Sequence, residues 1–426
     1  MKFLKGSRDE FQKIKDESSW EDKADIIQRQ MAEVFGAKNL SFLMGSGCSS
    51  LRNGDDELGI STMRFLAEEF QTLLATEPAE NGGEVFVSPA QKGELHAKLG
   101  INLSADEVKG NLERMIEVLI NAHQFCKASG KGELSSVATL VDQIISGIKK
   151  FVLHKCTTGP FSNGDESVVA QYQRFYQSLA TRSRGLASPW VFTTNYDLFN
   201  ECAMDRSGIP YSNGFSGTIE RRFNPATYRL ALAEQLDITS RRWAAVDGFV
   251  HFCKLHGSVN WTEVEKGLFP IRESYSPLDP FTDRVMIYPI PSKQTASFGS
   301  PYSDMFREFQ RQVVQDQSVL IVMGYSFADE HVNNIIFQGL ALPSFRLIAF
   351  IDPETNDITR ELSALGDPRI WFVWGDGKEA GQKAHYFDGI VNHLMPTNAD
   401  QEIDQTIEKA LQTFLAKQQD KKNGEG

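Results

Sequence analysis

Short apolar runs constrain the fold of this chain more than any other feature. Each has the length of a β-strand, and several show no alternation of polar and apolar residues. Such continuous runs are typical of strands in a parallel sheet that is covered on both faces. The runs are LSFLMG at 40–45, WVFTT at 190–194, FVHFCKL at 249–255, VMIYP at 285–289, SVLIVMG at 318–324, RLIAFID at 346–352 and RIWFVW at 369–374.

Helical patterns lie between some of these runs. Residues 301–314 and 328–340 both carry apolar side chains at helical spacing. The alternation of strands and helices predicts an open α/β sheet, in which ligands bind beyond the carboxyl ends of the strands. Residues 7–35, with Ser7 as N-cap, are predicted to form a helix before the first strand.

The stretch from 61 to 185 is predicted to be almost entirely helical. Its apolar residues recur at helical spacing, and Gly-rich polar segments separate the helices. We therefore predict an α/β unit made of residues 1–60 and 186–398, interrupted by a helical insertion at 61–185. Residues 399–426 are predicted to form a C-terminal helix and tail.

Composition argues against several other classes of protein. The chain has 426 residues and a formal net charge of -12, which disfavours direct nucleic-acid binding because phosphate contacts need clustered Lys and Arg. Its five cysteines include no C-x-x-C pair, so neither a zinc module nor a disulfide framework is indicated. No apolar run is long enough to span a membrane and no secretory core is present, so we expect a cytoplasmic protein.

Two glycine-containing turns follow predicted strands. They are GSGCS at 45–49 and GYSF at 324–327. Glycine permits a tight turn and lets backbone N–H groups approach a phosphate without a Cβ in the way. An ordinary strand-ending turn is the alternative for GSGCS, whereas GYSF, which opens a helix, suits a phosphate or a ribose.

TTNYD at 193–197 also ends a predicted strand, where side chains face the ligand crevice of an α/β sheet. Asn195 can donate and accept hydrogen bonds, and Asp197 can accept them from hydroxyl groups, which suits a ribose. The alternative is an Asx turn in which Asp197 caps the following helix.

KLHGS at 254–258 places a histidine directly after another strand. His256, next to Gly257, could act as a general base near neutral pH. A structural histidine is the alternative, and His251 within the strand is interpreted as structural.

Smaller signals complete the set. Asp352 ends a strand, where a carboxylate commonly accepts from adenosine ribose hydroxyls, and Gly377 lies in a GDG turn that could approach an adenine ring. Ordinary turns are the alternative for both. Asp329 and His331 are interpreted as capping and solvent-facing residues at the start of a helix.

Taken in order, these motifs resemble the sirtuin family. GSGCS, TTNYD, LHGS, GYSF, an acid after a late strand and GDG match that family in residue type and in sequence order. The resemblance covers residues 40–55 and about 190–390. It implies an α/β fold with a Rossmann-like parallel sheet that binds NAD, here with a large α-helical insertion.

The resemblance also implies roles for individual residues. Asn195 would position an attacking water and, with Asp197, hold the nicotinamide ribose, while His256 would act as general base on a ribose hydroxyl. The remaining cofactor contacts that it implies are Gly45, Ser46, Gly47 and Ser49 at the pyrophosphate, Gly324 and Ser326 on the phosphate and adenosine side, Asp352 at the adenosine ribose and Gly377 at the adenine.

The chain departs from the deacylating sirtuins in several places. It lacks their four-cysteine zinc module, it has Thr194 where they carry glutamine, and it reads SSLRNGDDE at 49–57 where they carry a Pro-Asp-Phe-Arg run. These departures argue against recognition of acyl-lysine. The chain is similar instead to bacterial sirtuin-like effectors of anti-phage defence, which hydrolyse NAD, and resembles the stand-alone kind that works beside a HerA-type ATPase.

The activity that this resemblance implies is cleavage of NAD to nicotinamide and ADP-ribose, with NAD as substrate and no zinc. The alternatives are a protein deacylase or ADP-ribosyltransferase that uses the same site, and a non-catalytic NAD sensor. We expect a homo-oligomer that a partner or assembly activates. The helical insertion could make those contacts or could cover the NAD cleft.

Overall fold

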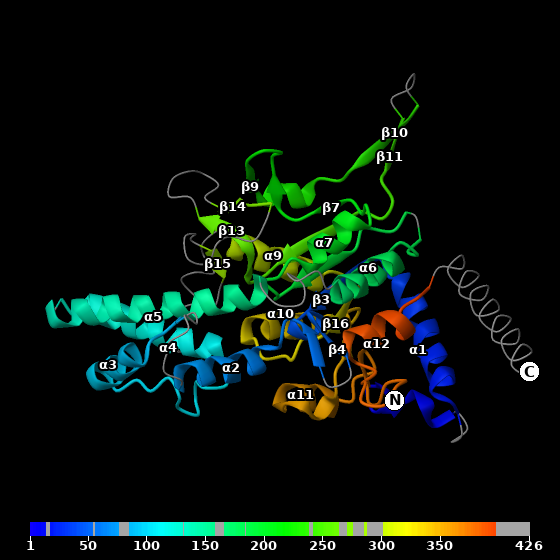
Figure 1. The fold of residues 1–426 in the computed structure, drawn as a ribbon. Coiled ribbons are helices and arrows are strands. Elements are labelled where there is room, and N and C mark those ends of the chain that lie inside the picture. The colour runs from blue at the N-terminus through cyan, green and yellow to red at the C-terminus, as the bar shows by residue number, and fades with distance from the viewer. Residues whose placement is uncertain are drawn as a thin grey trace, which may run out of the picture.

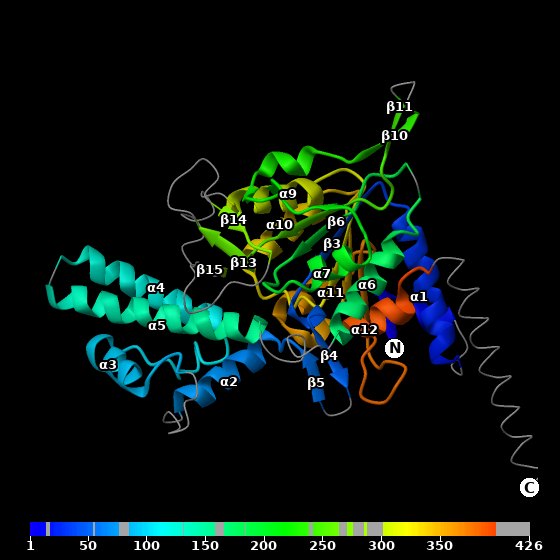
Figure 2. The same cartoon turned by 45° about the horizontal axis from the view of Figure 1, so that its top comes forward.

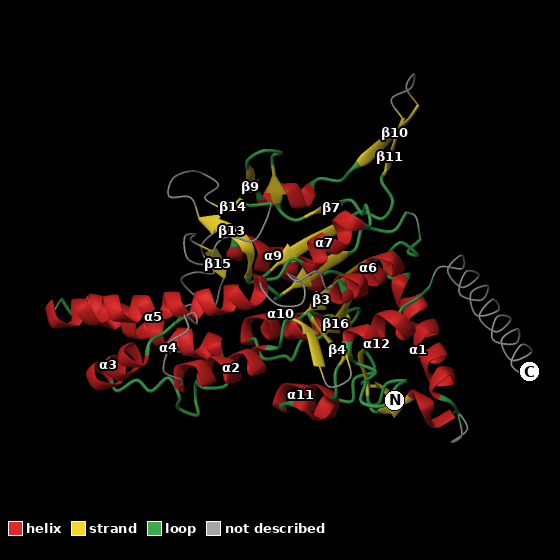
Figure 3. Cartoon of the chain, in the orientation of Figure 1, coloured by secondary structure: helices red, strands yellow, loops and turns green. Residues whose placement is uncertain are grey.

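The computed structural model describes most of the chain. The described residues are 1–13, 18–53, 56–75, 85–130, 132–157, 166–183, 185–237, 242–263, 271–275, 285–287 and 301–397. At the centre lies a nine-stranded sheet of order β2-β1-β18-β17-β16-β3-β6-β12-β7, with helices on both faces (Figure 3). The predicted α/β class with a mostly parallel sheet is confirmed.

Most of the predicted apolar runs form the middle of this sheet. The strands are β3 (Asn39–Met44), β6 (Trp190–Thr193), β7 (Tyr211–Ser212), β12 (Val250–Lys254), β16 (Ser318–Met323), β17 (Arg346–Phe350) and β18 (Ile370–Trp374). Neighbouring strands from β18 to β7 pair in parallel. Every residue of β6, β16 and β18 is buried, as the absence of alternation predicted.

Each face of the sheet has its own hydrophobic core. The helices that cover one face are α1 (Trp20–Phe35), α6 (Ser167–Leu179) and α7 (Phe199–Arg206), and those on the other are α9 (Tyr302–Val313), α10 (Glu330–Leu340) and α11 (Asp357–Ala364). Phe42 and Ile321 belong to the first core, while their neighbours Leu43 and Leu320 belong to the second. Burial on both faces therefore accounts for the continuous apolar runs.

The N-terminal segment differs from the prediction of one helix over 7–35. It contains β1 (Lys2–Lys5), β2 (Arg8–Asp9) and the 3-10 helix η1 (Glu10–Lys13), and α1 begins only at Trp20. The Ser19 side chain accepts from the backbone N–H of Asp22, whose side chain accepts from that of Ser19. This capping box, and not Ser7, starts the helix.

The described part of the predicted run at 285–289, residues 285–287, is a strand outside the central sheet. β15 (Val285–Ile287) pairs antiparallel with β13 in a five-stranded sheet. The other members of that sheet are β8 (Phe215–Ser216), β9 (Arg221–Phe223), β13 (Gly257–Glu263) and β14 (Ile271–Glu273).

Several short elements complete the described chain. A hairpin of β10 and β11 projects away from the body (Figure 1). The elements are β4 (Ser50–Asn53), β5 (Asp56–Gly59), β10 (Ala233–Asp237), β11 (Arg242–Ala245), η2 (Ser46–Cys48), η3 (Pro225–Arg229), η4 (Pro353–Thr355), α12 (Phe387–Gly389) and the π-helix η5 (Ile390–Leu394).

Four helices form a separate body beside the sheet, which we name the helical module. Its members are α2 (Met63–Ala75), α3 (Pro89–Leu99), α4 (Leu112–Ala128) and α5 (Gly132–Thr157). They lie together to one side of the sheet in both views and share their own apolar core (Figures 1 and 2). α6 falls within the predicted insertion at 61–185, yet it packs in the core of the sheet with α1 and α7.

The predicted C-terminal helix and tail at 399–426 lie outside the described residues. Within the described part, no helix is both long and apolar enough to cross a membrane.

Two glycine loops meet where β3 and β16 end. A Cβ on Gly45 would lie 2.5 Å from the carbonyl oxygen of Gly324, and one on Gly47 would lie 2.9 Å from its Cα. The N–H of Gly47 donates to that same carbonyl at 2.9 Å. Gly324 itself has a φ of +61°, and a Cβ there would lie 2.6 Å from the backbone nitrogen of Cys48. Only glycine lets these two loops approach so closely.

We expect Gly324→Ala to be strongly destabilising. Gly208 has nearly the same φ, +63°, with nothing within 4 Å of a Cβ placed there, so Gly208→Ala is a matched control. The left-handed conformation alone costs an alanine about 1–2 kcal/mol, and overpacking adds about 1–3 kcal/mol. In urea denaturation, Gly324→Ala should lose more free energy of unfolding than Gly208→Ala by that second amount. Equal losses would show that the loop contact is not tight.

Candidate functional site

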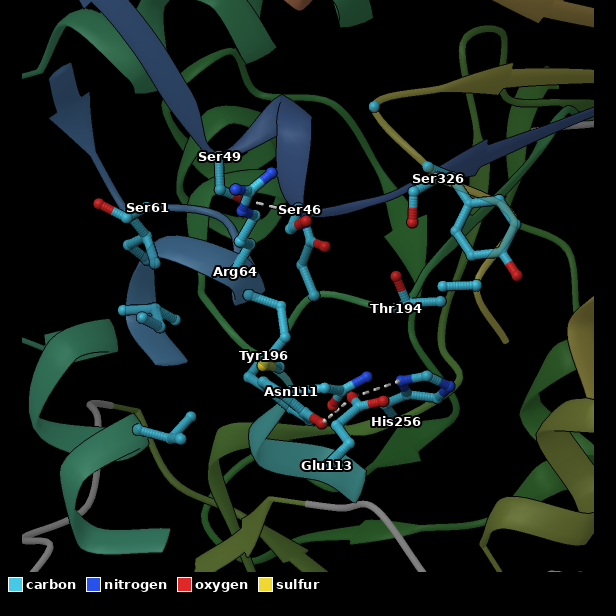
Figure 4. A pocket seen from close by; sticks show the side chains of 18 of the residues that line it. Ser46, Ser49, Ser61, Arg64, Asn111, Glu113, Thr194, Tyr196, His256 and Ser326 are labelled. Carbon is cyan, nitrogen blue, oxygen red and sulfur yellow. Dashed lines mark hydrogen bonds and ion pairs between the residues drawn. The ribbon is translucent and has the colours of Figure 1, made fainter. Parts of the chain in front are cut away.

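A cavity of about 290 Å³ lies beyond the carboxyl ends of β3, β6, β12 and β16. Side chains that follow these strands form one wall, among them Ser46, Thr194, His256 and Ser326 (Figure 4). The helical module forms the opposite wall with residues of α2, α4 and α5. This is the edge of the sheet at which the sequence predicted a ligand.

The cavity brings together most of the predicted site residues. Those that line it are Ser46, Ser49, Asn195, Asp197, His256, Gly324 and Ser326. The predicted residues that do not line it are Gly45, Gly47, Asp352 and Gly377.

Asn195 has a fixed side chain. Its Nδ2 donates to the carbonyl of Gly45 at 2.9 Å and to Ser49 Oγ at 2.8 Å. Its Oδ1 is buried and has no hydrogen-bond partner among the described residues. A buried acceptor without a partner is costly in a folded protein unless a ligand or a water satisfies it. Asn195, which lines the cavity, therefore has one buried acceptor without a partner in the described part of the chain.

Asp197 is buried next to Asn195 and already makes two contacts. Its Oδ1 accepts from the N–H of Phe199 at 3.0 Å, so the Asx turn that was the alternative interpretation is present. Its Oδ2 accepts from Ser49 Oγ at 2.6 Å. Ser49 thus links both polar residues of the TTNYD segment to the first glycine loop.

His256 lies between two carboxylates. Its Nε2 is 2.9 Å from Asp329 Oδ2, and its Nδ1 is 4.0 Å from Glu113 Oε1. A carboxylate against a ring nitrogen fixes the orientation of an imidazole. The simple structural interpretation of His256 does not explain why it lines a cavity together with Asn195.

Asp329 is a site residue that the sequence interpretation missed. It does cap α10, as predicted, because Oδ1 accepts from the N–H groups of His331 and Val332. Its other oxygen contacts His256. The hydroxyl of Tyr325 donates to the carbonyl of Asp329 and accepts from its N–H, which holds this turn in place.

The helical module supplies further residues that the sequence did not identify. Glu113, in the first turn of α4, accepts a hydrogen bond from the Tyr196 hydroxyl at 3.2 Å. Burial, and the nearby Glu113 carboxylate, raise the pKa of Tyr196, so its hydroxyl keeps the proton that it donates. Arg64 of α2 is the one Lys or Arg among the described residues that line the cavity.

The backbone of the first glycine loop is already largely hydrogen-bonded. The N–H groups of Gly45, Gly47, Cys48 and Ser49 all donate to backbone carbonyls within the protein. Of this loop, Ser46 and Ser49 line the cavity. Contact with a pyrophosphate remains a prediction for this loop.

Asp352 and Gly377 make local turn contacts. Asp352 Oδ1 accepts from the N–H of Glu354 and caps η4, while the N–H of Gly377 donates to the carbonyl of Gln382. These are the ordinary turns considered as alternatives, and contacts with an adenosine remain predictions.

The buried side chain of Lys254 contacts the loop that carries Asn195. Lys254 Nζ donates to Glu201 Oε1 at 2.8 Å, to Ser258 Oγ at 2.9 Å and to the backbone carbonyl of Asp197. Burial raises the pKa of Glu201 to about 7, although Lys254 opposes this change. Lys254 therefore ties β12 to the loop after β6.

Residues 189–371 match the model of the SIR2-like domain. The match supports a sirtuin-like family. It contains Asn195, His256 and Asp329, whereas the first glycine loop and the helical module lie outside it. A comparison with curated proteins finds no match. Among the described residues, no group of three or more His, Cys, Asp or Glu is arranged to hold a metal ion.

We expect Lys254→Met to destabilise the protein by about 3–5 kcal/mol near pH 8, because Glu201 is left buried without its cation. The double variant Lys254→Met/Glu201→Gln should recover most of this loss, since no uncompensated charge remains. Folding raises the Glu201 pKa from 4.5 to about 7, so the protonated form is favoured in the folded state. Near pH 5 Glu201 is protonated in the folded protein, so Lys254→Met should lose less free energy of unfolding there than at pH 8. Urea denaturation at both pH values measures it, and equal losses for the single and double variants would contradict the pairing.

Proposed function

We propose that this chain is an NAD hydrolase that cleaves the bond between nicotinamide and ribose. The observation that carries this proposal is the state of Asn195, whose Nδ2 is fully used while its Oδ1 has no partner among the described residues, and which lines the same cavity as His256. A fixed carbonyl acceptor can orient a water molecule for attack. The SIR2-like match over 189–371 supports NAD as the substrate.

The cleavage breaks the bond between ribose C1′ and the nicotinamide nitrogen. Both electrons leave with nicotinamide, and positive charge develops on the ribose, as in glycoside hydrolysis. A water oxygen then bonds to C1′ and loses a proton to the solvent, which gives ADP-ribose. In this scheme Asn195 Oδ1 holds the water and His256 acts as base on a ribose hydroxyl.

The charges around the cavity suit this chemistry. The carboxylates of Glu113, Asp197 and Asp329 line it, and negative charge stabilises a developing oxocarbenium ion. In the close-up, Arg64 is drawn well away from His256 and Glu113 (Figure 4). Arg64, with the hydroxyls of Ser46 and Ser326, would hold the diphosphate of NAD, because guanidinium and hydroxyl groups are good phosphate donors.

A hydrolase that destroys a central cofactor needs restraint. We therefore extend the proposal to an anti-phage effector whose activity is released by assembly or by a partner, with a second copy of the chain and a HerA-type ATPase as the candidates. The resemblance of TTNYD and GYSFADEHVNN to bacterial defence effectors supports this extension.

Asn195→Ala and His256→Ala should each lower NAD turnover by about 10²–10⁴-fold, the usual effect of losing a catalytic base or its positioned partner. The exposed His96 on α3 provides the control variant His96→Ala, which should retain full turnover. Turnover is measured as nicotinamide and ADP-ribose released, with the chain alone and with a candidate ATPase.

The products also separate the alternatives. Transfer of ADP-ribose to protein, or turnover only with an acyl-lysine peptide, would favour a transferase or deacylase. NAD binding without any turnover in every mixture would favour a sensor.

Asp329→Asn should lower kcat by about 10- to 100-fold, since hydrogen bonds to charged groups contribute about 1.5–3 kcal/mol. Asparagine is also a good N-cap, so α10 and the unfolding temperature should be unchanged. Steady-state kinetics and thermal denaturation test this. An unchanged kcat would mean that the contact between Asp329 and His256 does not serve the reaction.

A further inference from the structure

The helical module packs against the loop after β6, which carries Asn195. Its apolar core includes Tyr196, which stands between Asn195 and Asp197 in the chain. Tyr196 is only 8% exposed, and Val259 of β13 enters the same core. The backbone N–H of Val259 donates to the carbonyl of Tyr196 at 3.0 Å. The loop that carries Asn195 is thus anchored in the module.

Glu113 forms a second link between the module and the site. Asn111 caps α4 by accepting from the N–H of Arg114, which fixes the first turn of that helix and with it Glu113. Glu113 Oε1 accepts from the Tyr196 hydroxyl at 3.2 Å and lies 4.0 Å from His256 Nδ1. One carboxylate oxygen therefore faces both the loop anchor and the catalytic histidine (Figure 4).

We propose that the helical module is part of the catalytic site and that Glu113 is its positioning residue, which holds His256 and Tyr196 in their working orientation. This inference rests on the proposed hydrolase function and deepens it. Asp329 approaches His256 Nε2 from the sheet side, and Glu113 approaches Nδ1 from the module side. Only Asp329 is within hydrogen-bond distance, so Nε2 donates to it, and Nδ1 keeps the lone pair that a base needs while Glu113 bounds that side of the ring.

A purely structural role for Glu113 is a poor alternative. Its side chain is 33% exposed in the cavity, so burial does not demand a partner for it. The module is already held together by a large apolar core that includes Phe70, Phe151 and Leu119. Removing the charge of Glu113 should therefore alter the reaction far more than the fold.

The test variant is Glu113→Gln, which keeps the size of the side chain and an acceptor for Tyr196 but removes the charge. Glu117→Gln is the matched control, because Glu117 lies one turn further along α4, pairs with Arg114 and does not line the cavity. We expect Glu113→Gln to lower kcat about tenfold or more, with the KM for NAD within about twofold, because a charged hydrogen-bond partner is lost near the reacting groups. Glu117→Gln should match the wild type.

A second readout does not depend on turnover. The imidazole ¹⁵N resonances of His256, assigned by their absence in His256→Ala, should move in Glu113→Gln and stay in place in Glu117→Gln. Tyr196→Phe removes one hydroxyl while keeping the apolar packing, and it should lower kcat without lowering the unfolding temperature.

The outcomes separate the two proposals. If the wild type does not consume NAD, the hydrolase proposal fails, while the resonances still show whether Glu113 acts on His256. If the wild type is active and Glu113→Gln keeps its kcat, the role of Glu113 is refuted. It is equally refuted if kcat falls but the His256 resonances do not move, or if Glu117→Gln loses as much activity.

Discussion

The close contact between the loops after β3 and β16 organises the candidate site. Gly45 and Gly47 lie against Gly324 at distances that exclude a Cβ, which brings two strand ends into backbone contact. The carbonyl of Gly45 then accepts from Asn195 Nδ2, which leaves Oδ1 as a buried oxygen without a partner among the described residues. Three glycines thereby help to fix the orientation of the Asn195 amide, the group that we propose holds the attacking water.

The site is also a composite of two bodies with separate cores. The sheet supplies Asn195, His256 and Asp329, and the helical module supplies Glu113 and Arg64. Tyr196 belongs to both, because its backbone follows β6 and its ring packs in the module. In the proposed hydrolase, such an arrangement would let the position of one body control the reaction at the other.

The sequence was sufficient to predict the class of fold and most of the polar residues that line the cavity at the strand ends. Continuous apolar runs, and the turns that follow them, are local features of a sequence. It could not reveal that Asp329 meets His256. Their strands, β16 and β12, are separated in the sheet by β3 and β6, and strand order is a tertiary property. The sequence could not predict the place of Glu113 in the cavity for a similar reason. Nothing local distinguishes it from other acidic residues on amphipathic helices. The capping box at Ser19 is a local pattern, and it starts α1 in place of the predicted Ser7.

β1 has a consequence for handling the protein. It pairs antiparallel along β18, matching Phe3 with Val373, so it covers one edge of a strand that reads IWFVW and is buried throughout. Without β1, that apolar strand would form the rim of the sheet and present unpaired N–H and C=O groups, which is the usual template for intermolecular strand addition. Solubility therefore depends on the few residues at 2–5, and a tag or deletion that displaces them would promote aggregation even though the cavity lies elsewhere.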